Sequence, residues 1–384
     1  MGDVQAMFHQ VKVPKGDRDF LRFLWWPAAD LTKDVAEFRM TVHLFGATSS
    51  PSCAIFALRK TADDNQGNFP AEVIQAVKEN FYVDDCLKSM ASEEEAVQMV
   101  KHLTALCQRG GFTLTKWISN NRTILQTLPE EHKAKDLREL NLDRDKLPVE
   151  RALGLQWCIE TDSFKFKMET HQRSCTRRGM LSVSSSVFDP IGFLAPVLLP
   201  AKTMLQELCR RNFGWDETVP QDILHHWTRW LEELDMLSEF KIERCMKPKD
   251  FGNIVHAQLH NFSDASESGY GAVTYIRMQN NRNDSHVAFL IGKAKVTPLK
   301  AVTIPRLELT AAVLAVRIDL MLKTELRLPL QESVFWTDST SVLKDIMNED
   351  KRFHTFVANR VSAIRAATKT SQWRYVNTKE NPSG

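Results

Sequence analysis

The sequence predicts a mixed α and β protein in three parts, and the order of its local patterns leads to that prediction. Residues 3–128 mix short β-rich runs with helical segments. Residues 153–249 hold apolar segments punctuated by proline, followed by amphipathic helices. From residue 252 onward, strands and helices alternate again. We therefore expect an α+β region, a helical connection, and an α/β region with a mixed sheet.

The clearest single element is a helix that begins after Ser92. The run from Ser92 to Glu95 is typical of a capping box, apolar residues then recur at helical spacing, and Gly110 with Gly111 ends the helix. A strand over residues 112–117 follows. Residues 129–151 are densely charged and nearly free of aromatic residues, so we expect a surface connection or an exposed helix there.

Composition limits the class of protein but does not name a partner. The 384 residues suffice for two or three domains, and the net charge is +2. No apolar run approaches the roughly 20 residues that cross a bilayer, and no signal peptide opens the chain. The seven cysteines are scattered without a C-x-x-C pair, which favours free thiols in a reducing compartment. We expect an intracellular protein, cytoplasmic or nuclear, that does not contact membranes.

Adjacent carboxylates in the run Tyr82-Val83-Asp84-Asp85 form the first candidate site. Two metals about 4 Å apart can stabilise both the attacking and the leaving oxygen in phosphoryl transfer, and they need carboxylates from separate segments. Asp3 offers the second segment. Neighbouring residues of a strand point to opposite faces, so we expect Asp84 to be the stronger ligand of the two. An acidic hairpin tip is the alternative.

Three acids in the last third form a second candidate site. Asp264 ends one apolar strand, Asp338 ends another, and Glu308 lies on a predicted helix, so all three can meet at one edge of a sheet. Each also has a simpler interpretation: Asp264 and Asp338 as helix N-caps, and Glu308 as a surface acid.

With these motifs, the chain resembles nearly end to end the reverse transcriptase and ribonuclease H portion of a BEL/Pao-type long-terminal-repeat retrotransposon polyprotein. The resemblance implies a reverse transcriptase palm over residues 1–128, a thumb or connection with a Pao-type segment over residues 129–250, and a ribonuclease H-like domain over residues 251–384. It implies an RNA-directed DNA polymerase with ribonuclease H activity, and two Mg²⁺ (or Mn²⁺) ions in each active site. The implied partners are an RNA template, a DNA primer, RNA–DNA hybrids and dNTPs; the oligomeric state is not predicted.

The resemblance also assigns binding residues. It places Phe8, five positions after Asp3, against the ribose of the incoming nucleotide, although ordinary palm core is the alternative. Nucleotide contacts are implied for Phe45, Gly46 and Lys116, the last of which is equally typical of a solvated strand end. The primer grip is implied for Leu153, Gly154 and Trp157.

Departures from the family pattern support a second hypothesis, a catalytically dead nucleic-acid-binding remnant. The fingers that precede the first palm motif are expected to be missing. The ribonuclease H pattern usually closes with an acid after Asn-Pro-Ser, where this chain has Gly384. No D-[ST]-G turn supports an aspartic peptidase in the Pao-type segment.

Overall fold

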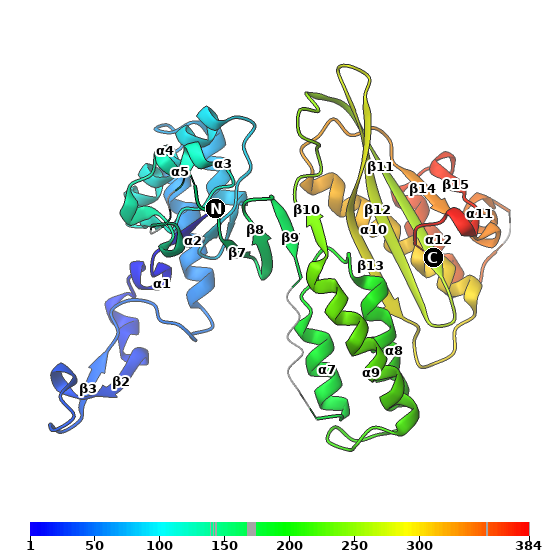
Figure 1. Cartoon of the computed structure of the whole chain (residues 1–384), viewed down its shortest axis with the longest axis horizontal. Helices are drawn as coiled ribbons and strands as arrows, with labels where there is room; N and C mark the ends of the chain where they lie inside the picture. Colours follow the sequence, from blue (N-terminus) through cyan, green and yellow to red (C-terminus); the bar gives the residue numbers. More distant parts are fainter. Residues whose placement is uncertain (139, 141, 143, 167–173, 351, 384) are drawn as a thin grey trace. The chain divides into compact units, whose positions relative to one another are not determined.

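The computed structural model describes residues 1–383 apart from residues 139, 141, 143, 167–173 and 351, and it groups them into two compact units (Figure 1). The first unit comprises Met1–Leu153 and Cys158–Thr161, and the second comprises the remaining described residues. The three-part division expected from the sequence stays a prediction. All seven cysteines are free. No described helix has the length and apolar character needed to span a membrane.

The first unit is built on a four-stranded sheet with three long helices packed together beside it. The strand order is β4 (Phe81–Tyr82), β5 (Asp85–Cys86), β1 (Gly2–Val4) and β6 (Leu114–Thr115), and β1 is antiparallel to both of its neighbours. The helices are α2 (Ser50–Asp64), α3 (Ala71–Glu79) and α4 (Glu93–Arg109). Their apolar faces share a core with the sheet, in which Leu58, Leu106 and Leu114 are fully buried.

Two local predictions in this unit have different outcomes. The helix after Ser92 is confirmed, because the Ser92 hydroxyl accepts a hydrogen bond from the Glu95 amide and the helix ends before Gly110. The strand expected over residues 112–117 is regular only at Leu114–Thr115. The segment 129–151 is less exposed than its charge suggests, since Ala134, Leu137 and Leu147 are buried; its residues 139, 141 and 143 lie outside the described residues.

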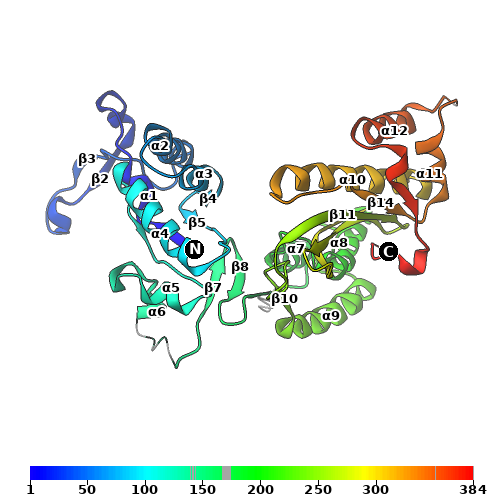
Figure 2. The same ribbon diagram turned by 90° about the horizontal axis from the view of Figure 1, so that it is seen from above.

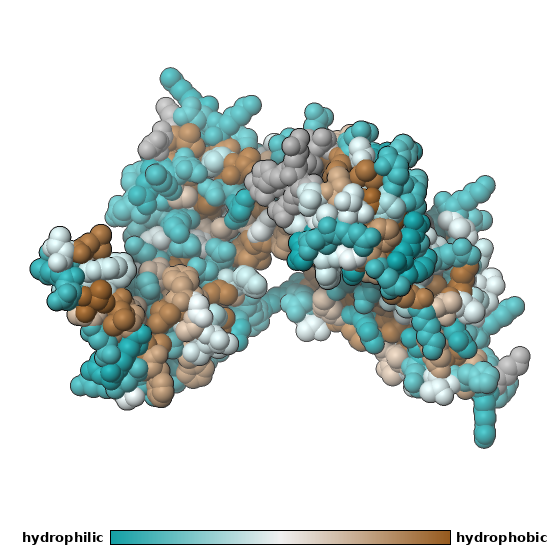
Figure 3. Space-filling model, turned by 90° about the horizontal axis from the view of Figure 1, so that it is seen from below, coloured by the Kyte–Doolittle hydropathy of each residue, from teal (hydrophilic) through white to brown (hydrophobic). Residues whose placement is uncertain are grey.

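Shorter elements complete the first unit. They are α1 (Met7–Gln10), the hairpin of β2 (Arg22–Trp25) and β3 (Ala36–Arg39), α5 (Arg122–Gln126), α6 (Lys135–Arg138), β7 (Val149–Ala152) and the 3-10 turns Lys15–Leu21, Pro27–Ala29 and Glu130–His132. The β2–β3 hairpin exposes large apolar side chains, and Figure 3 shows them as brown atoms at the left end. Phe23 and Phe38 stack across its two strands.

The second unit contains the expected mixed sheet, which has five strands. Its order is β13 (Ser285–Val296), β12 (Gly269–Asn280), β11 (Ile254–Ala265), β14 (Val334–Thr337) and β15 (Trp373–Tyr375). The first three strands are antiparallel, whereas β11, β14 and β15 run parallel. Along β11, Ala257, Leu259, Asn261 and Ser263 alternate into the buried face, as the period of a strand requires.

Helices lie on both faces of this sheet (Figure 2). One face carries α10 (Ile304–Glu325), with α11 (Thr340–Met347) packed on β14 and β15; α12 (Thr355–Ala367) packs against α10 and α11. Inside this layer, the Asn261 amide donates to the Asp319 carboxylate at 3.0 Å, and Lys323 pairs with the other oxygen of that carboxylate at 2.7 Å. A buried carboxylate left without partners would be costly, so this network ties α10 to β11.

The remaining elements include the helical stretch of the second unit, short strands on either side of it, and two 3-10 turns next to β15. They are β8 (Leu155–Cys158), β9 (Ser163–Lys165), α7 (Arg177–Ser186), α8 (Ala195–Arg210), α9 (Gln221–Asp235), β10 (Lys241–Glu243) and the 3-10 turns Met236–Glu239, Thr370–Gln372 and Thr378–Glu380. Trp227 and Trp230 stack at 4.7 Å between ring centroids and fill the core between these helices.

A tight loop joins the helical stretch to the sheet. The Asp189 carboxylate accepts hydrogen bonds from the Phe193 and Leu194 amides, and the Gly292 amide of β13 donates to the Ile191 carbonyl at 2.8 Å. Gly192 has φ +72°, and a Cβ there would lie 1.8 Å from the Gly292 carbonyl oxygen. Only glycine combines this backbone angle with such a close approach.

We expect Gly192→Ala to destabilise the second unit by about 2–4 kcal/mol, because backbone strain and a steric clash add together. Gly252 is the matched control: its φ is +84°, but the nearest atom that an added Cβ would meet is the flexible Asn281 side-chain oxygen at 3.2 Å. Gly252→Ala should therefore cost only about 1 kcal/mol. Chemical denaturation of both variants tests this, and equal losses would contradict the close packing at Gly192.

Candidate metal centre

The second acidic system lies at one edge of the mixed sheet. Asp264 is the penultimate residue of β11, and Asp338 directly follows β14. These strands are parallel neighbours in which Phe262 pairs with Trp336, and the two rings stack with centroids 5.9 Å apart. Because the pairing continues in register, Asp264 and Asp338 emerge side by side at the carboxyl ends of the strands.

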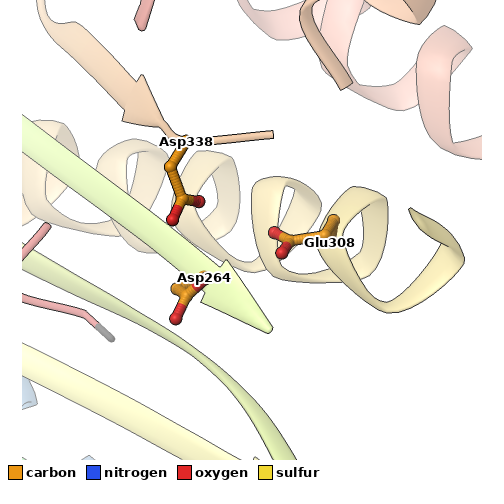
Figure 4. Close-up of side chains that lie close together, drawn as sticks. All are labelled: Asp264, Glu308 and Asp338. Carbon is orange, nitrogen blue, oxygen red and sulfur yellow. The ribbon is translucent and has the colours of Figure 1, made fainter. Parts of the chain in front are cut away.

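The long helix α10 brings the third carboxylate to this edge. Glu308 lies in the second turn of α10, whose apolar residues pack on β11 and β12. Its side chain points toward Asp264 and Asp338 (Figure 4), and one oxygen from each of the three carboxylates lies within 4.8 Å of the others. Among the described residues, this is the one group of three potential metal ligands with that spacing. The predicted convergence therefore occurs in the structure.

Burial and like charge make this cluster unstable as three anions. Burial raises the pKa of Glu308 to about 8, and the negative charges of Asp264 and Asp338 act in the same direction. Burial and the Asp338 charge also raise the pKa of Asp264. Glu308 Oε2 and Asp338 Oδ1 are buried without a hydrogen-bond partner among the described residues. Buried carboxylate oxygens need protons, donors or a cation, so the three residues fit a divalent ion with oxygen ligands.

The simpler interpretations of these acids are wrong. The N-cap of α11 is Ser339, whose hydroxyl accepts from the Val342 amide, and not Asp338. Asp264 lies inside β11 and caps no helix. Glu308 is 7% exposed, so it is not a surface acid.

The end of the chain also returns to this edge. The buried Asn381 side chain donates to the carbonyl of Ser263, the residue before Asp264, at 3.2 Å. Its own side-chain oxygen accepts from the Ser383 amide and hydroxyl. The run Asn-Pro-Ser is thus anchored next to the acids. Gly384, where the family pattern has its fourth acid, lies outside the described residues.

The first acidic system is arranged differently. Asp3 of β1 pairs with Asp85 of β5, and Asp84 lies in the turn that precedes β5. Burial raises the pKa of Asp85, and the charges of Asp84 and Asp3 act in the same direction. Lys116 forms an ion pair with Asp3 at 3.1 Å. The described atoms of these three acids do not meet the spacing seen in the second system. Their role as metal ligands stays a prediction.

Of the residues expected to contact a nucleotide, Lys116 contacts the first acidic system through its ion pair with Asp3. Phe8 is 8% exposed and belongs to the core of the first unit, and its ring meets the exposed Phe45 edge to face at 4.8 Å. Gly46 has φ +86° with open space where a Cβ would point. The nucleotide-binding roles of Phe8, Phe45, Gly46 and Lys116 stay predictions.

The expected primer grip contains a tight turn and a buried indole. Leu153 and Gly154 both have positive φ. Trp157 is 7% exposed, and its Nε1 donates to Asp162 at 2.9 Å. Arg244 binds the same carboxylate through two nitrogens. The Trp157 side chain therefore holds a local polar network, and primer binding by this turn stays a prediction.

Sequence reasoning missed a basic and aromatic cluster between α10 and α12. It consists of Arg306 and Thr310 on α10 with Phe356 and Arg360 on α12. The position of Arg306, two residues before Glu308, was the only available signal, since nothing in the sequence brings α12 to α10.

The fold and the acidic edge together define a domain with a candidate divalent-cation site. Comparison with known proteins finds one matching family and similar solved structures. Residues 176–339 match the family described as the Pao retrotransposon-like RNaseH-like domain. The match includes Asp264, Glu308 and Asp338, and it begins near α7, so it also takes in helices that we had expected to form a thumb or connection. These matches do not show the reverse transcriptase part or a BEL-type relationship, which stay predictions.

Two solved structures of ribonucleases H are also similar. The RNase H1 of the halophilic archaeon Halobacterium salinarum is 10% identical, with a TM-score of 0.24, over 34% of this chain and 91% of its own. The N-terminal RNase H domain of a Mycobacterium tuberculosis protein, solved as a fusion with maltose-binding protein, is 12% identical, with a TM-score of 0.23, over 34% of this chain and 86% of its own. No curated protein matches the chain significantly.

Proposed function

We propose that the second unit is the ribonuclease H of a retroelement and hydrolyses the RNA strand of an RNA–DNA hybrid. The observation that carries this proposal is the convergence of Asp264, Glu308 and Asp338 within 4.8 Å at the edge of the mixed sheet. The match to a Pao retrotransposon-like RNaseH-like domain over the same residues supports it. Mg²⁺ or Mn²⁺, two per site, is the proposed cofactor.

Divalent ions held by these carboxylates would supply charge stabilisation at phosphorus and a more acidic water. The chain itself contributes a rigid geometry. Asp264 and Asp338 are held by neighbouring parallel strands, and Glu308 is held by a buried helix. Glu308, with its pKa raised to about 8, must release a proton when it becomes a ligand. The stacked Phe262 and Trp336 rings help to fix the pairing of β11 with β14, which places Asp264 and Asp338 next to each other.

Cleavage of a labelled hybrid by the full chain tests this proposal. With Mg²⁺ or Mn²⁺, the RNA strand of an RNA–DNA hybrid should be cut, whereas the same RNA as a single strand should survive. Chelation by EDTA should abolish cleavage, because the reaction needs a cation to stabilise the charge that develops at phosphorus. The three carboxylates cannot supply that positive charge. Equal cleavage of single-stranded RNA, or cleavage that survives EDTA, would contradict the assignment.

We further propose that the first unit derives from a reverse transcriptase palm. The pairing of Asp3 with Asp85 and the ion pair of Asp3 with Lys116 support this origin. An RNA-directed DNA polymerase acting on a template, a primer and dNTPs is the stronger form of the proposal. A nucleic-acid-binding remnant without polymerase chemistry is the alternative. Primer extension on an RNA template with Mg²⁺ discriminates between the two.

A further inference from the structure

We infer that the β2–β3 hairpin of the first unit (Figure 1) is a self-association surface, through which β3 pairs with β3 of a second copy of this chain. In the described part of the chain, β2 and β3 pair only with each other. A sheet of two strands is marginally stable in water, whereas three or more strands with an apolar face are stable. The hairpin exposes large apolar side chains, among them Phe23, Leu24, Trp25 and Phe38. It therefore gains stability when further strands join it.

The hydrogen-bond register of the hairpin leaves the backbone groups of Glu37 and Arg39 on its outer edge. The Met40 amide donates to the Leu21 carbonyl at 3.0 Å, so every second residue of β3, counted back from Met40, bonds to β2. The N–H and C=O groups of Glu37 and Arg39 point the other way. No described residue outside the hairpin forms a hydrogen bond with these groups. Such an open edge is a template for another strand.

The charges on this edge select one register for the pairing of two β3 strands. Antiparallel pairing about a twofold axis joins outward positions, so Glu37 faces Glu37, Arg39 faces Arg39, or each Glu37 faces the partner's Arg39. The first two registers put like charges directly opposite each other, which destabilises a sheet. The third gives two attractive pairs, with Phe38 on the axis. The outer edge of β2 lacks this complementarity, because its outward residues are Arg22 and Leu24.

The same register builds an apolar row across the combined sheet. Phe23 and Phe38 are cross-strand neighbours whose rings stack with centroids 5.9 Å apart. Joining two hairpins in the order β2, β3, β3, β2 puts four phenylalanine side chains on one face of a four-stranded sheet, because paired residues of a ladder share a face. Glu37 and Arg39 lie on the opposite face in exposed ion pairs within the chain. Exposed ion pairs contribute little to stability, so a change of partner costs little.

Sedimentation velocity of the full chain over a range of concentrations tests this inference. The apparent mass should rise from that of one chain toward that of two. Glu37→Arg and Arg39→Glu should each weaken this association at least about 10-fold, because each puts like charges opposite each other at two places. Both side chains are exposed in the single chain, so the variants should fold as the wild type does. Asp34→Arg is the matched control: it makes the same change of charge as Glu37→Arg, but in the exposed turn before β3.

A mixture of the two variants gives the sharper result. Glu37→Arg presents only positive charges on this edge and Arg39→Glu only negative charges, so the two proteins should form a mixed dimer about as readily as the wild type associates with itself. A wild type that stays monomeric, or variants that associate as the Asp34→Arg control does, would overturn the inference. A mixture that stays monomeric would also overturn it. None of these results depends on hybrid cleavage by the second unit.

Discussion

Asp338→Asn should reduce Mg²⁺-dependent cleavage of an RNA–DNA hybrid by at least about 100-fold. Substitutions that only touch the surroundings of a metal ligand already cost roughly 10- to 100-fold, and this one changes a proposed ligand. Asparagine keeps the size of the side chain but removes one negative charge from the three that hold the cations. Asp338 Oδ1 is one of the buried carboxylate oxygens that lack a hydrogen-bond partner among the described residues.

The control for this variant is Asp284→Asn. It removes the same charge from the same unit, but Asp284 lies in the turn between β12 and β13, at the opposite end of the strands from Asp264. Its cleavage rate should equal that of the wild type. Rates should be measured with saturating hybrid over a range of Mg²⁺ concentrations. A rate for Asp338→Asn within about threefold of the control would show that the acidic edge is not the catalytic centre.

Glu308 should make the stability of the metal-free protein fall as the pH rises from about 4.5 to 8. The pKa of this side chain rises from an ordinary value of 4.5 to about 8 in the fold. Between these values the folded state holds a proton that the unfolded state has released, so unfolding becomes easier at higher pH. The expected loss is a few kcal/mol, since each unit of pKa difference corresponds to about 1.4 kcal/mol.

Glu308→Gln isolates this contribution because glutamine has a similar size and does not titrate. In EDTA, the wild type should match the variant near pH 5 and become progressively less stable than it toward pH 8. With excess Mg²⁺ at pH 8 the order should reverse, because an ion that binds only the folded state stabilises it. Thermal unfolding at several pH values measures both effects. A constant difference between the two proteins across this range would contradict the raised pKa of Glu308.

The predictions that depended on neighbouring residues in the chain were the most successful. Ser92 caps α4 through a hydrogen bond to an amide three residues away, which is a purely local interaction. The apolar strand expected to end at Asp264 is β11, and Asp264 is its penultimate residue. Local patterns were less useful where tertiary contacts decide exposure: the charged segment 129–151 contributes buried residues such as Leu137 because apolar positions within it meet the core.

The candidate site shows the same division. Adjacent residues were enough to show which acids stand at strand ends and on the long helix, because strands and helices are recognised from local patterns. The meeting of Asp264, Glu308 and Asp338 within 4.8 Å, the raised pKa of Glu308 and the sharing of the Phe356 ring by Arg306 and Arg360 became visible in the folded chain alone. Desolvation and Coulomb interactions act through space, so they depend on which distant segments pack together and not on their order in the chain.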